Sequence, residues 1–328
     1  MAAITSPARI SGLLELALLA ALHTAAAAAA EPALFEARQL TPTGEYTFGI
    51  EGPAVDAAAG TLYVVNLRKQ GTIGKVLPGA TSSTPFIELP PGSIANAIRF
   101  DRDGRMFLAD YKNHNVFVIE RGEDTPRVYF NSPQFNQPND LTVASDGTLY
   151  ASDPHWRRRD GQVWRITRQA DGSGLGEVMS ADRKMGTTNG IDLSPDEKTL
   201  YVGESETREI WAYRIDGAKL SAPRLFIRFP DFSLDGLRTD VDGNLLVTRI
   251  LKGTVAILRP DGQLLREIPL KAKEPTNLAF GGADGKTVFV TQRQGGFIET
   301  FRVERPGREF CLQLKNAACG ARAAVPMR

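Results

Sequence analysis

The chain has 328 residues, of which 39 are Lys or Arg and 38 are Asp or Glu, so its positive and negative charges nearly cancel. Because there is no excess of basic residues to form a positive face, a nucleic-acid partner is not expected. The 31 Gly and 20 Pro residues, with little helix-type periodicity after residue 35, favour an all-β chain of short strands joined by turns.

Residues 1–30 have the pattern of a signal peptide. Arg9 precedes an apolar run over residues 13–22, which only Glu15 interrupts, and residues 25–30 are all Ala. The competing interpretation is a membrane anchor, but the run is shorter than the roughly 20 residues that cross a bilayer. We therefore expect an exported protein, periplasmic or secreted, that is cleaved near Ala30 and has no stable membrane insertion afterwards.

Residues 31–50 form a lead-in with one predicted strand at 46–50, and six copies of one pattern follow. Each copy has a small or polar start, an alternating apolar strand, a tight turn and a second, more apolar strand. Aligned on their turns, the copies begin 44, 43, 51, 45 and 43 residues apart. The aligned turn residues are Gly60, Gly104, Gly147, Lys198, Gly243 and Lys286.

A repeat of this length with an alternation of period two is typical of a propeller blade. Third and outer strands complete most copies. The sequence therefore predicts a six-bladed β-propeller over residues 31–304, with four-stranded blades around a central channel. The longest interval contains residues 169–176, which we interpret as an insertion and not as a site.

Residues 305–328 form a C-terminal tail, predicted to be an irregular cap or partly disordered. The tail holds both cysteines, Cys311 and Cys319, and the sequence leaves open whether they form a disulfide. A structural zinc site there is excluded, because zinc needs four ligands and no histidine lies nearby.

The opening residue of every copy carries an oxygen donor. In a propeller the first strand of each blade lines the channel, so these side chains should form a ring at one end of it. Carboxylate and amide oxygens around one point predict a divalent-cation site, with Ca²⁺ as the first choice and Mg²⁺, Mn²⁺ or Zn²⁺ as alternatives. The competing interpretation is that Asn-Gly and Asp-Gly pairs are ordinary turn residues. The six residues are Glu51, Asn96, Asn139, Asn189, Asp235 and Thr276.

Several segments resemble motifs of the gluconolactonase / senescence marker protein / luciferin-regenerating enzyme family. The resemblance covers roughly residues 45–304. Its motifs are Glu51-Gly-Pro-Ala-Val-Asp56, Gln137-Pro-Asn-Asp140, Thr188-Asn-Gly-Ile-Asp192, Leu234-Asp-Gly-Leu237 and Thr276-Asn-Leu-Ala-Phe280.

The resemblance implies metal ligands at Glu51, Asn139, Asn189 and Asp235, and leaves Asn96 and Thr276 as channel lining or substrate contacts. Two features of the family are absent: blade two has no Arg-x-Asn substrate motif, and no histidine follows His155.

The implied activity is metal-dependent hydrolysis of a lactone, such as gluconolactone, or of a similar small ester. The cation would polarise the carbonyl, with Asp235 as base towards water or as nucleophile. Asp140 and His155 are further candidates for substrate contact, as are Trp156 and Arg293 near the expected mouth.

Two other functions remain open at this point. One is a non-catalytic propeller that binds a ligand or a protein, and the other is a strictosidine-synthase-like enzyme on the same scaffold. We expect a monomer in each case.

Overall fold

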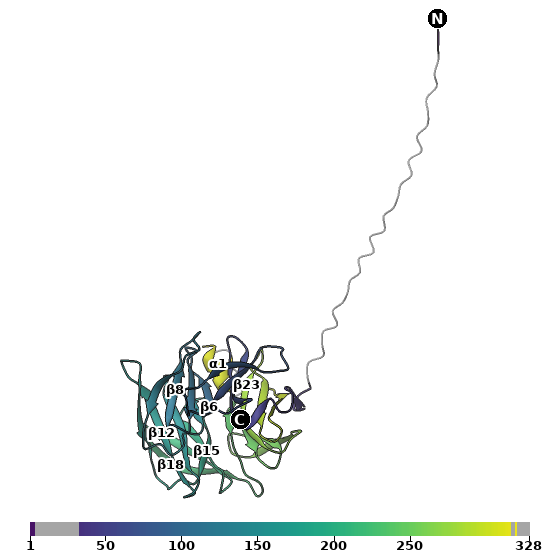
Figure 1. The fold of residues 1–328 in the computed structure, drawn as a ribbon. Coiled ribbons are helices and arrows are strands. Elements are labelled where there is room, and N and C mark those ends of the chain that lie inside the picture. Colours follow the sequence, from purple (N-terminus) through teal and green to yellow (C-terminus); the bar gives the residue numbers. More distant parts are fainter. Residues whose placement is uncertain (4–32, 316–318, 320–328) are drawn as a thin grey trace. The chain divides into compact units, whose positions relative to one another are not determined.

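Six small antiparallel sheets form the protein, as the repeat predicts, in a computed structural model that describes residues 1–3, 33–315 and 319 (Figure 1). The chain divides into two units, residues 1–31 and 32–328, and the sheets belong to the second. The predicted signal peptide falls almost entirely outside the described residues, so it stays a prediction. Among the described residues, no helix has the length and apolar character needed to cross a membrane.

In blades 1–5 the four main strands run from inner to outer in chain order. Blade 1 consists of β2 (Tyr46–Asp56), β3 (Thr61–Leu67), β4 (Thr72–Val76) and β5 (Thr84–Glu88). Blade 2 consists of β6 (Ala95–Phe100), β7 (Met106–Asp110), β8 (Asn115–Ile119) and β9 (Arg127–Asn131). Blade 3 consists of β10 (Leu141–Val143), β11 (Leu149–His155), β12 (Asp160–Arg168) and β13 (Gly174–Val178).

The other three blades follow the same order, with two additions. Blade 4 consists of β15 (Thr188–Leu193), β16 (Thr199–Glu204), β17 (Glu209–Asp216) and β18 (Lys219–Arg228), with β14 (Ser180–Ala181) parallel to β18. Blade 5 consists of β19 (Leu237–Thr239), β20 (Leu245–Arg249), β21 (Thr254–Leu258) and β22 (Leu264–Pro269). Blade 6 consists of β23 (Pro275–Gly281), β24 (Thr287–Gln292), β25 (Phe297–Arg302) and β1 (Arg38–Gln39).

The six blades close into a ring. Their inner strands touch in cyclic order, and β2 of blade 1 contacts both β6 of blade 2 and β23 of blade 6. The sixth blade takes its outer strand from the other end of the chain, since β1 pairs with β25 in the register Arg38↔Thr300. The sequence did not predict β1, and residues 46–50 are the first part of β2, not a separate strand.

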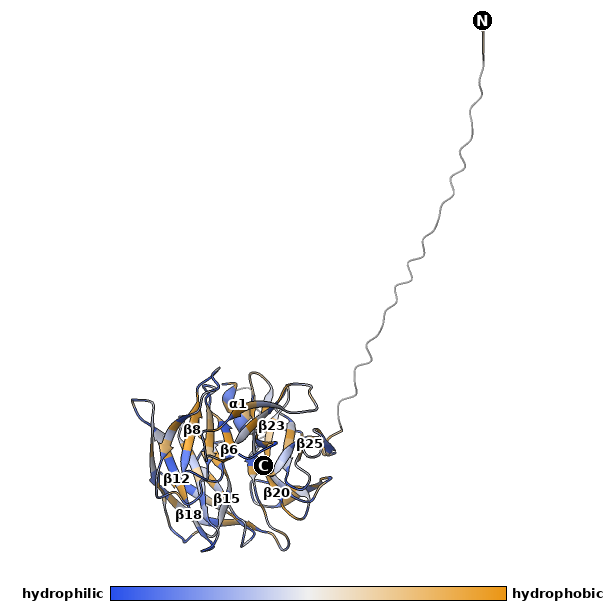
Figure 2. Cartoon of the chain, in the orientation of Figure 1, coloured by the Kyte–Doolittle hydropathy of each residue, from blue (hydrophilic) through white to orange (hydrophobic). Residues whose placement is uncertain are grey.

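The hydrophobic core consists of six clusters, and each lies between two neighbouring blades. The cluster between blades 2 and 3, for example, packs Phe107 and Tyr129 with their rings edge to face at 5.0 Å against Leu141 and Trp164. Figure 2 shows this distribution as apolar residues along the blade strands, with hydrophilic residues towards the loops. Since each blade packs on both neighbours, the ring is held without a single central apolar core.

The channel is instead filled by paired charges. Asp140, which precedes β10 and is 0% exposed, accepts hydrogen bonds from Arg99 Nη2 on β6 at 2.5 Å and from Arg238 Nη1 on β19 at 2.9 Å. The Asn277 side chain on β23 also donates to Asp140, at 3.4 Å. Blades 2, 3, 5 and 6 are therefore tied together across the channel by one carboxylate.

A short helix, α1 (Arg308–Gln313), closes the channel at the carboxyl ends of the inner strands. Arg308 Nη2 donates to Asp192 Oδ1 at 3.1 Å and to Thr142 Oγ1 at 2.9 Å, while Gln313 Nε2 donates to the Val55 carbonyl at 2.9 Å. Residues 308–315 therefore cap the channel and include a helix that the sequence did not predict, while residues 316–318 and 320–328 lie outside the described residues. Helix α1 is too short to give a recognisable helical pattern in the sequence, and its contacts with three inner strands hold it in place.

A disulfide joins Cys311 of α1 to Cys319, with the two Cα atoms 5.6 Å apart. The structure thereby answers the question that the spacing of the cysteines left open. Because the bond links α1 to residue 319, it holds this part of the tail against the closed end of the channel.

We predict that Asp140→Asn lowers the free energy of unfolding by about 3–5 kcal/mol, because two buried guanidinium groups lose their shared carboxylate. Urea denaturation followed by fluorescence measures the change. The control is Asp103→Asn at the exposed Lys315–Asp103 pair, which should cost under about 1 kcal/mol. Equal effects of the two substitutions would contradict the structural role of Asp140.

Candidate active site

The amino-terminal ends of the inner strands lie at the channel end away from α1, and they carry the residues that the repeat alignment singled out. Glu51 lies within β2 and Asn189 within β15, while Asp235 and Asn139 stand two residues before β19 and β10. Equivalent positions of six similarly directed strands therefore meet at one end of the channel, as the sequence predicted.

Small residues allow these strand ends to approach one another. The Gly190 N–H donates to the Asp235 carbonyl at 3.2 Å, and a Cβ on Gly190 would lie only 2.3 Å from that oxygen. Likewise, a Cβ on Gly236 would lie 2.2 Å from Asn277 Oδ1. Asn189-Gly190 lies within a strand, so the alternative interpretation of this pair as a turn is wrong, and its glycine serves close packing between blades.

Two carboxyl groups, of the buried Glu51 and the half-buried Asp235, face this end of the channel. Burial raises the pKa of Glu51, and the nearby Asp140 carboxylate adds to the rise, whereas the Gly52 N–H, which donates to Glu51 Oε2 at 2.7 Å, opposes it. Burial also raises the pKa of Asp235 well above its usual range, and the Glu51 carboxylate raises it further. Asp235 is therefore close enough to Glu51 for the two charges to repel.

Amide side chains complete the surroundings of the two carboxyls. Asn189 lies within hydrogen-bonding reach of Asp235, and its Nδ2 donates to Ser205 Oγ at 2.9 Å. On the other side, Asn96 Nδ2 donates to the Asn139 main-chain oxygen at 3.4 Å. The set is rich in oxygen and has neither thiolate nor imidazole.

This set of donors fits a hard divalent cation. Two carboxylates that repel each other at this end of the channel would both be stabilised in their charged form by a cation between them. Oxygen ligands of this kind suit Ca²⁺. Within residues 33–315, no group of three or more His, Cys, Asp or Glu side chains is arranged to hold a metal, so such a site would depend on the asparagine oxygens as well.

A pocket of about 470 Å³ opens over Asp235 and Asn189. Its wall includes Trp156 after β11, Arg208 before β17 and Arg293 after β24. These are loops at the same channel end as the ring, so the pocket gives a small molecule access to the Asp235 carboxyl.

His155 lies elsewhere on this face. It lines a second pocket of about 500 Å³ with His114 and Phe135, and Trp156 is shared between the two pockets. The His155 Nδ1 accepts a hydrogen bond from the Arg158 N–H at 3.2 Å. His155 therefore neighbours the Asp235 pocket without lining it, and its predicted contact with substrate stays a prediction.

Two other candidates for substrate contact, Asp140 and Thr276, are buried, and Thr276 thereby fits its alternative role as channel lining. Asp140 is fully buried below the ring, where both its oxygens bind arginines, so it does not stand at the mouth. Thr276 is also buried, and its hydroxyl donates to the Ile50 carbonyl at 3.0 Å, which joins blade 6 to blade 1. A buried group whose hydrogen bonds are satisfied within the protein is unavailable to a ligand.

The sequence analysis missed Asn277, the neighbour of Thr276. Its side chain contacts Asp140 and lies within hydrogen-bonding reach of Glu51, so it links the channel charges to the ring. The aligned copies could have identified Asn277, because it occupies the same repeat position as Asp140, where the other four copies have Gly or Ala.

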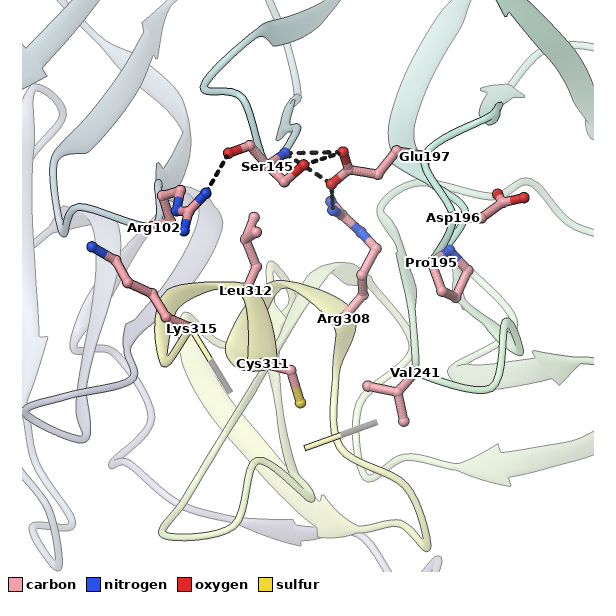
Figure 3. A pocket seen from close by; sticks show the side chains of 10 residues that line it. All are labelled: Arg102, Ser145, Pro195, Asp196, Glu197, Val241, Arg308, Cys311, Leu312 and Lys315. Carbon is pink, nitrogen blue, oxygen red and sulfur yellow. Dashed lines mark hydrogen bonds and ion pairs between the residues drawn. The ribbon is translucent and has the colours of Figure 1, made fainter. Parts of the chain in front are cut away.

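A further pocket of about 500 Å³ lies beside α1 at the closed end of the channel (Figure 3). Two of its charged groups are paired with each other, since Glu197 accepts from Arg308 Nη1 at 3.4 Å as well as from the Ser145 N–H at 2.8 Å. None of the six ring residues lines it. The pocket over Asp235 is therefore the better candidate for the active site.

Comparison with known proteins gives a family match over residues 50–294, described as the SMP-30/Gluconolactonase/LRE-like region. The chain belongs to this family. The resemblance read from the motifs is thus confirmed.

Two curated relatives in this family carry hydrolase names. A gluconolactonase from Zymomonas mobilis is 27% identical over 61% of this chain, and the alignment covers 61% of that protein, less than two thirds of its length. A diisopropyl-fluorophosphatase from Loligo vulgaris is 27% identical over 68% of this chain and 77% of its own. The fold matches the gluconolactonase structure from Xanthomonas campestris with a TM-score of 0.68, at 24% identity, over 83% of this chain and 89% of that one.

The paired carboxyls predict an unusual pH dependence in chelator-treated protein. Because folding raises the pKa of Glu51 and of Asp235, the folded protein binds more protons than the unfolded chain above pH about 4, so its free energy of unfolding should fall as pH rises towards 8. Asp235→Asn removes one charge and should raise the free energy of unfolding at pH 8 by about 1 kcal/mol or more.

Urea denaturation at pH 5 and pH 8 measures both effects. Glu206→Gln is the matched control, since Glu206 lines the same pocket but is exposed. A destabilised Asp235→Asn protein at pH 8 would show that the two carboxylates do not repel each other.

Proposed function

We propose that the protein is a metal-dependent hydrolase that opens the ring of a sugar-acid lactone, such as gluconolactone, or cleaves a similar small ester. The observation that carries the proposal is the pair of a buried Glu51 and a half-buried Asp235, two carboxyls that share one end of the channel with Asn189 beneath an open pocket. Membership of the family and the hydrolase names of its relatives support the same reaction.

Glu51, Asn139, Asn189 and Asp235 would hold the cation, for which Ca²⁺ is our first choice. When bound, the cation supplies a Lewis acid that polarises the carbonyl and stabilises its developing negative charge. Glu51 is fixed for this role by the Gly52 N–H, and Asn189 by its bond to Ser205.

Asp235 is proposed to act on the ester bond from the floor of the pocket. As a base, it takes a proton from water while the water oxygen bonds to the carbonyl carbon, and it returns the proton to the ring oxygen as the ring C–O bond breaks. As a nucleophile, its carboxylate bonds to the carbonyl carbon as the ring C–O bond breaks, and the ring oxygen takes a proton from water. The resulting hydroxide then attacks the anhydride, which frees the Asp235 carboxylate. Both routes end in the open hydroxy acid.

We also propose that residues 1–30 direct the protein out of the cytoplasm and are removed, so that a monomer acts in the periplasm or outside the cell. The charged start, apolar run and alanine-rich end of this segment support export. The disulfide between Cys311 and Cys319 fits an oxidising compartment.

We predict that the mature protein hydrolyses D-glucono-1,5-lactone, that chelator treatment abolishes the activity and that Ca²⁺ restores it. Asp235→Asn should lower kcat by about 100-fold or more, because the group that moves the proton or attacks the carbon is lost. Proton release in weakly buffered solution, corrected for spontaneous hydrolysis, measures the rate.

Calorimetric titration with Ca²⁺ separates the alternatives. Bound Ca²⁺ without turnover of lactones or esters would favour a ligand-binding propeller. Turnover that persists in chelator and in Asp235→Asn would contradict the proposed mechanism.

A further inference from the structure

Arg293, which follows β24, is held in a set position at the edge of the candidate active site. Its Nε donates to Glu274 Oε2 at 3.2 Å, and its backbone N–H donates to the Glu274 carbonyl at 2.9 Å. Its guanidinium lies over the ring of Phe48, 4.6 Å from the ring centroid. These contacts fix a side chain that would otherwise move freely at the surface.

The packing also explains an exposed aromatic residue. Phe48 stands near the start of β2 with 69% of its surface exposed, although a large apolar side chain gains little there on its own. The Phe48 ring supports the Arg293 guanidinium, because stacking on an aromatic face restricts the orientation of the guanidinium plane.

The fixed guanidinium retains binding capacity. Only Nε is used by Glu274, and within the described part of the chain neither terminal nitrogen of Arg293 has a hydrogen-bond partner. Arg293 lines the same pocket as Asp235 and Asn189, and its positive charge acts on the Asp235 carboxyl. The Nη1–Nη2 edge is thus a free, planar pair of donors beside the proposed reaction centre.

We propose that Arg293 selects lactones that carry a second, negatively charged group, such as the free carboxylate of a sugar diacid monolactone. The inference rests on the proposed lactonase function and names its substrate class. Two parallel N–H donors match the two oxygens of a carboxylate, which a neutral hydroxymethyl group cannot imitate. Glu274 offsets the charge of Arg293, and the cation would balance those of Glu51 and Asp235, so the two terminal N–H donors of Arg293 would recognise the carboxylate.

Another arginine of the pocket is less well placed for this role. Arg208 also lines the pocket, but its Nη1 donates to the Pro230 carbonyl at 3.2 Å, and no aromatic ring stacks on it within the described residues. We therefore assign the selection to Arg293.

The test compares D-glucaro-1,4-lactone, which carries a carboxylate, with the neutral D-glucono-1,5-lactone on the Ca²⁺-loaded mature protein. Arg293→Gln should lower the ratio of the two kcat/KM values, acidic over neutral, by about tenfold or more, mainly through the KM for the acidic lactone. Arg293→Lys keeps the positive charge but lacks the planar pair of donors, so its ratio should lie between those of the wild type and Arg293→Gln. Arg259→Gln, which removes an exposed positive charge from the turn after β21, should leave the ratio as in the wild type.

A ratio unchanged by Arg293→Gln would overturn the proposal. So would an equal loss of kcat on both lactones, because it would place Arg293 in the reaction or in the support of Asp235.

A binding measurement keeps this inference separate from the proposed activity. Calorimetry with the open acids D-glucarate and D-gluconate should show tighter binding of glucarate to the wild type, with the preference lost in Arg293→Gln. This outcome supports Arg293 even if neither lactone is hydrolysed, in which case only the proposed function fails. Equal binding of the two acids, or no binding of either, contradicts the role of Arg293.

Discussion

The carboxylate of Asp140 is the contact on which the arrangement of the inner strands depends. Six strands converge on one axis, and the side chains that point inward must fill the space without leaving a charge unpaired. Asp140 meets this requirement by binding Arg99 and Arg238 from two other blades, while Arg308 of α1 pairs with Asp192 below. Positive and negative groups alternate along the channel, so burial of each charge is offset by its neighbours.

The candidate site follows from the same geometry. Where the strand ends carry Gly190 and Gly236, the backbones approach closely enough for Asn189, Asp235 and Glu51 to share one end of the channel. Below the ring Asp140 and Asp192 each have an arginine in contact, whereas burial and neighbouring carboxylates raise the pKa of Glu51 and of Asp235. Carboxyl groups with raised pKa values lower the free energy of unfolding when they are charged. Such groups are typical of functional sites, where a bound ligand can stabilise the charge.

The two ends of the channel have different roles. Helix α1 and the disulfide close the end where the inner strands finish. In the pocket of Figure 3, Glu197 accepts hydrogen bonds from Ser145 and from Arg308 of α1. The other end is open between short loops that carry Trp156, Arg208 and Arg293. The ring itself is set by the repeat, whereas the loops differ from blade to blade. We therefore expect the reaction to depend on the ring and the choice of substrate to depend on the loops.

The sequence by itself determined the features that recur in every blade, namely the hairpins and their number. Turn glycines such as Gly104 and Gly147, each with positive φ, and the alternation of apolar residues specify the hairpins, and six copies at a steady interval specify a six-bladed ring. The register of Glu51, Asn189 and Asp235 within the copies was enough to bring them to one end of the channel. These features depend on neighbouring residues, so the sequence displays them directly.

Only the tertiary structure decided the features that join distant segments. The pairing of β1 with β25 and the docking of α1 depend on which backbone lies opposite. The same holds for the contacts of Thr276 with Ile50 and of Asn277 with Asp140, and for the burial of Asp140 between two arginines. The same is true of Phe48 beneath Arg293, two residues at opposite ends of the chain. Such contacts leave no periodic trace in the sequence, because each is made once, between elements that meet only when the ring has closed.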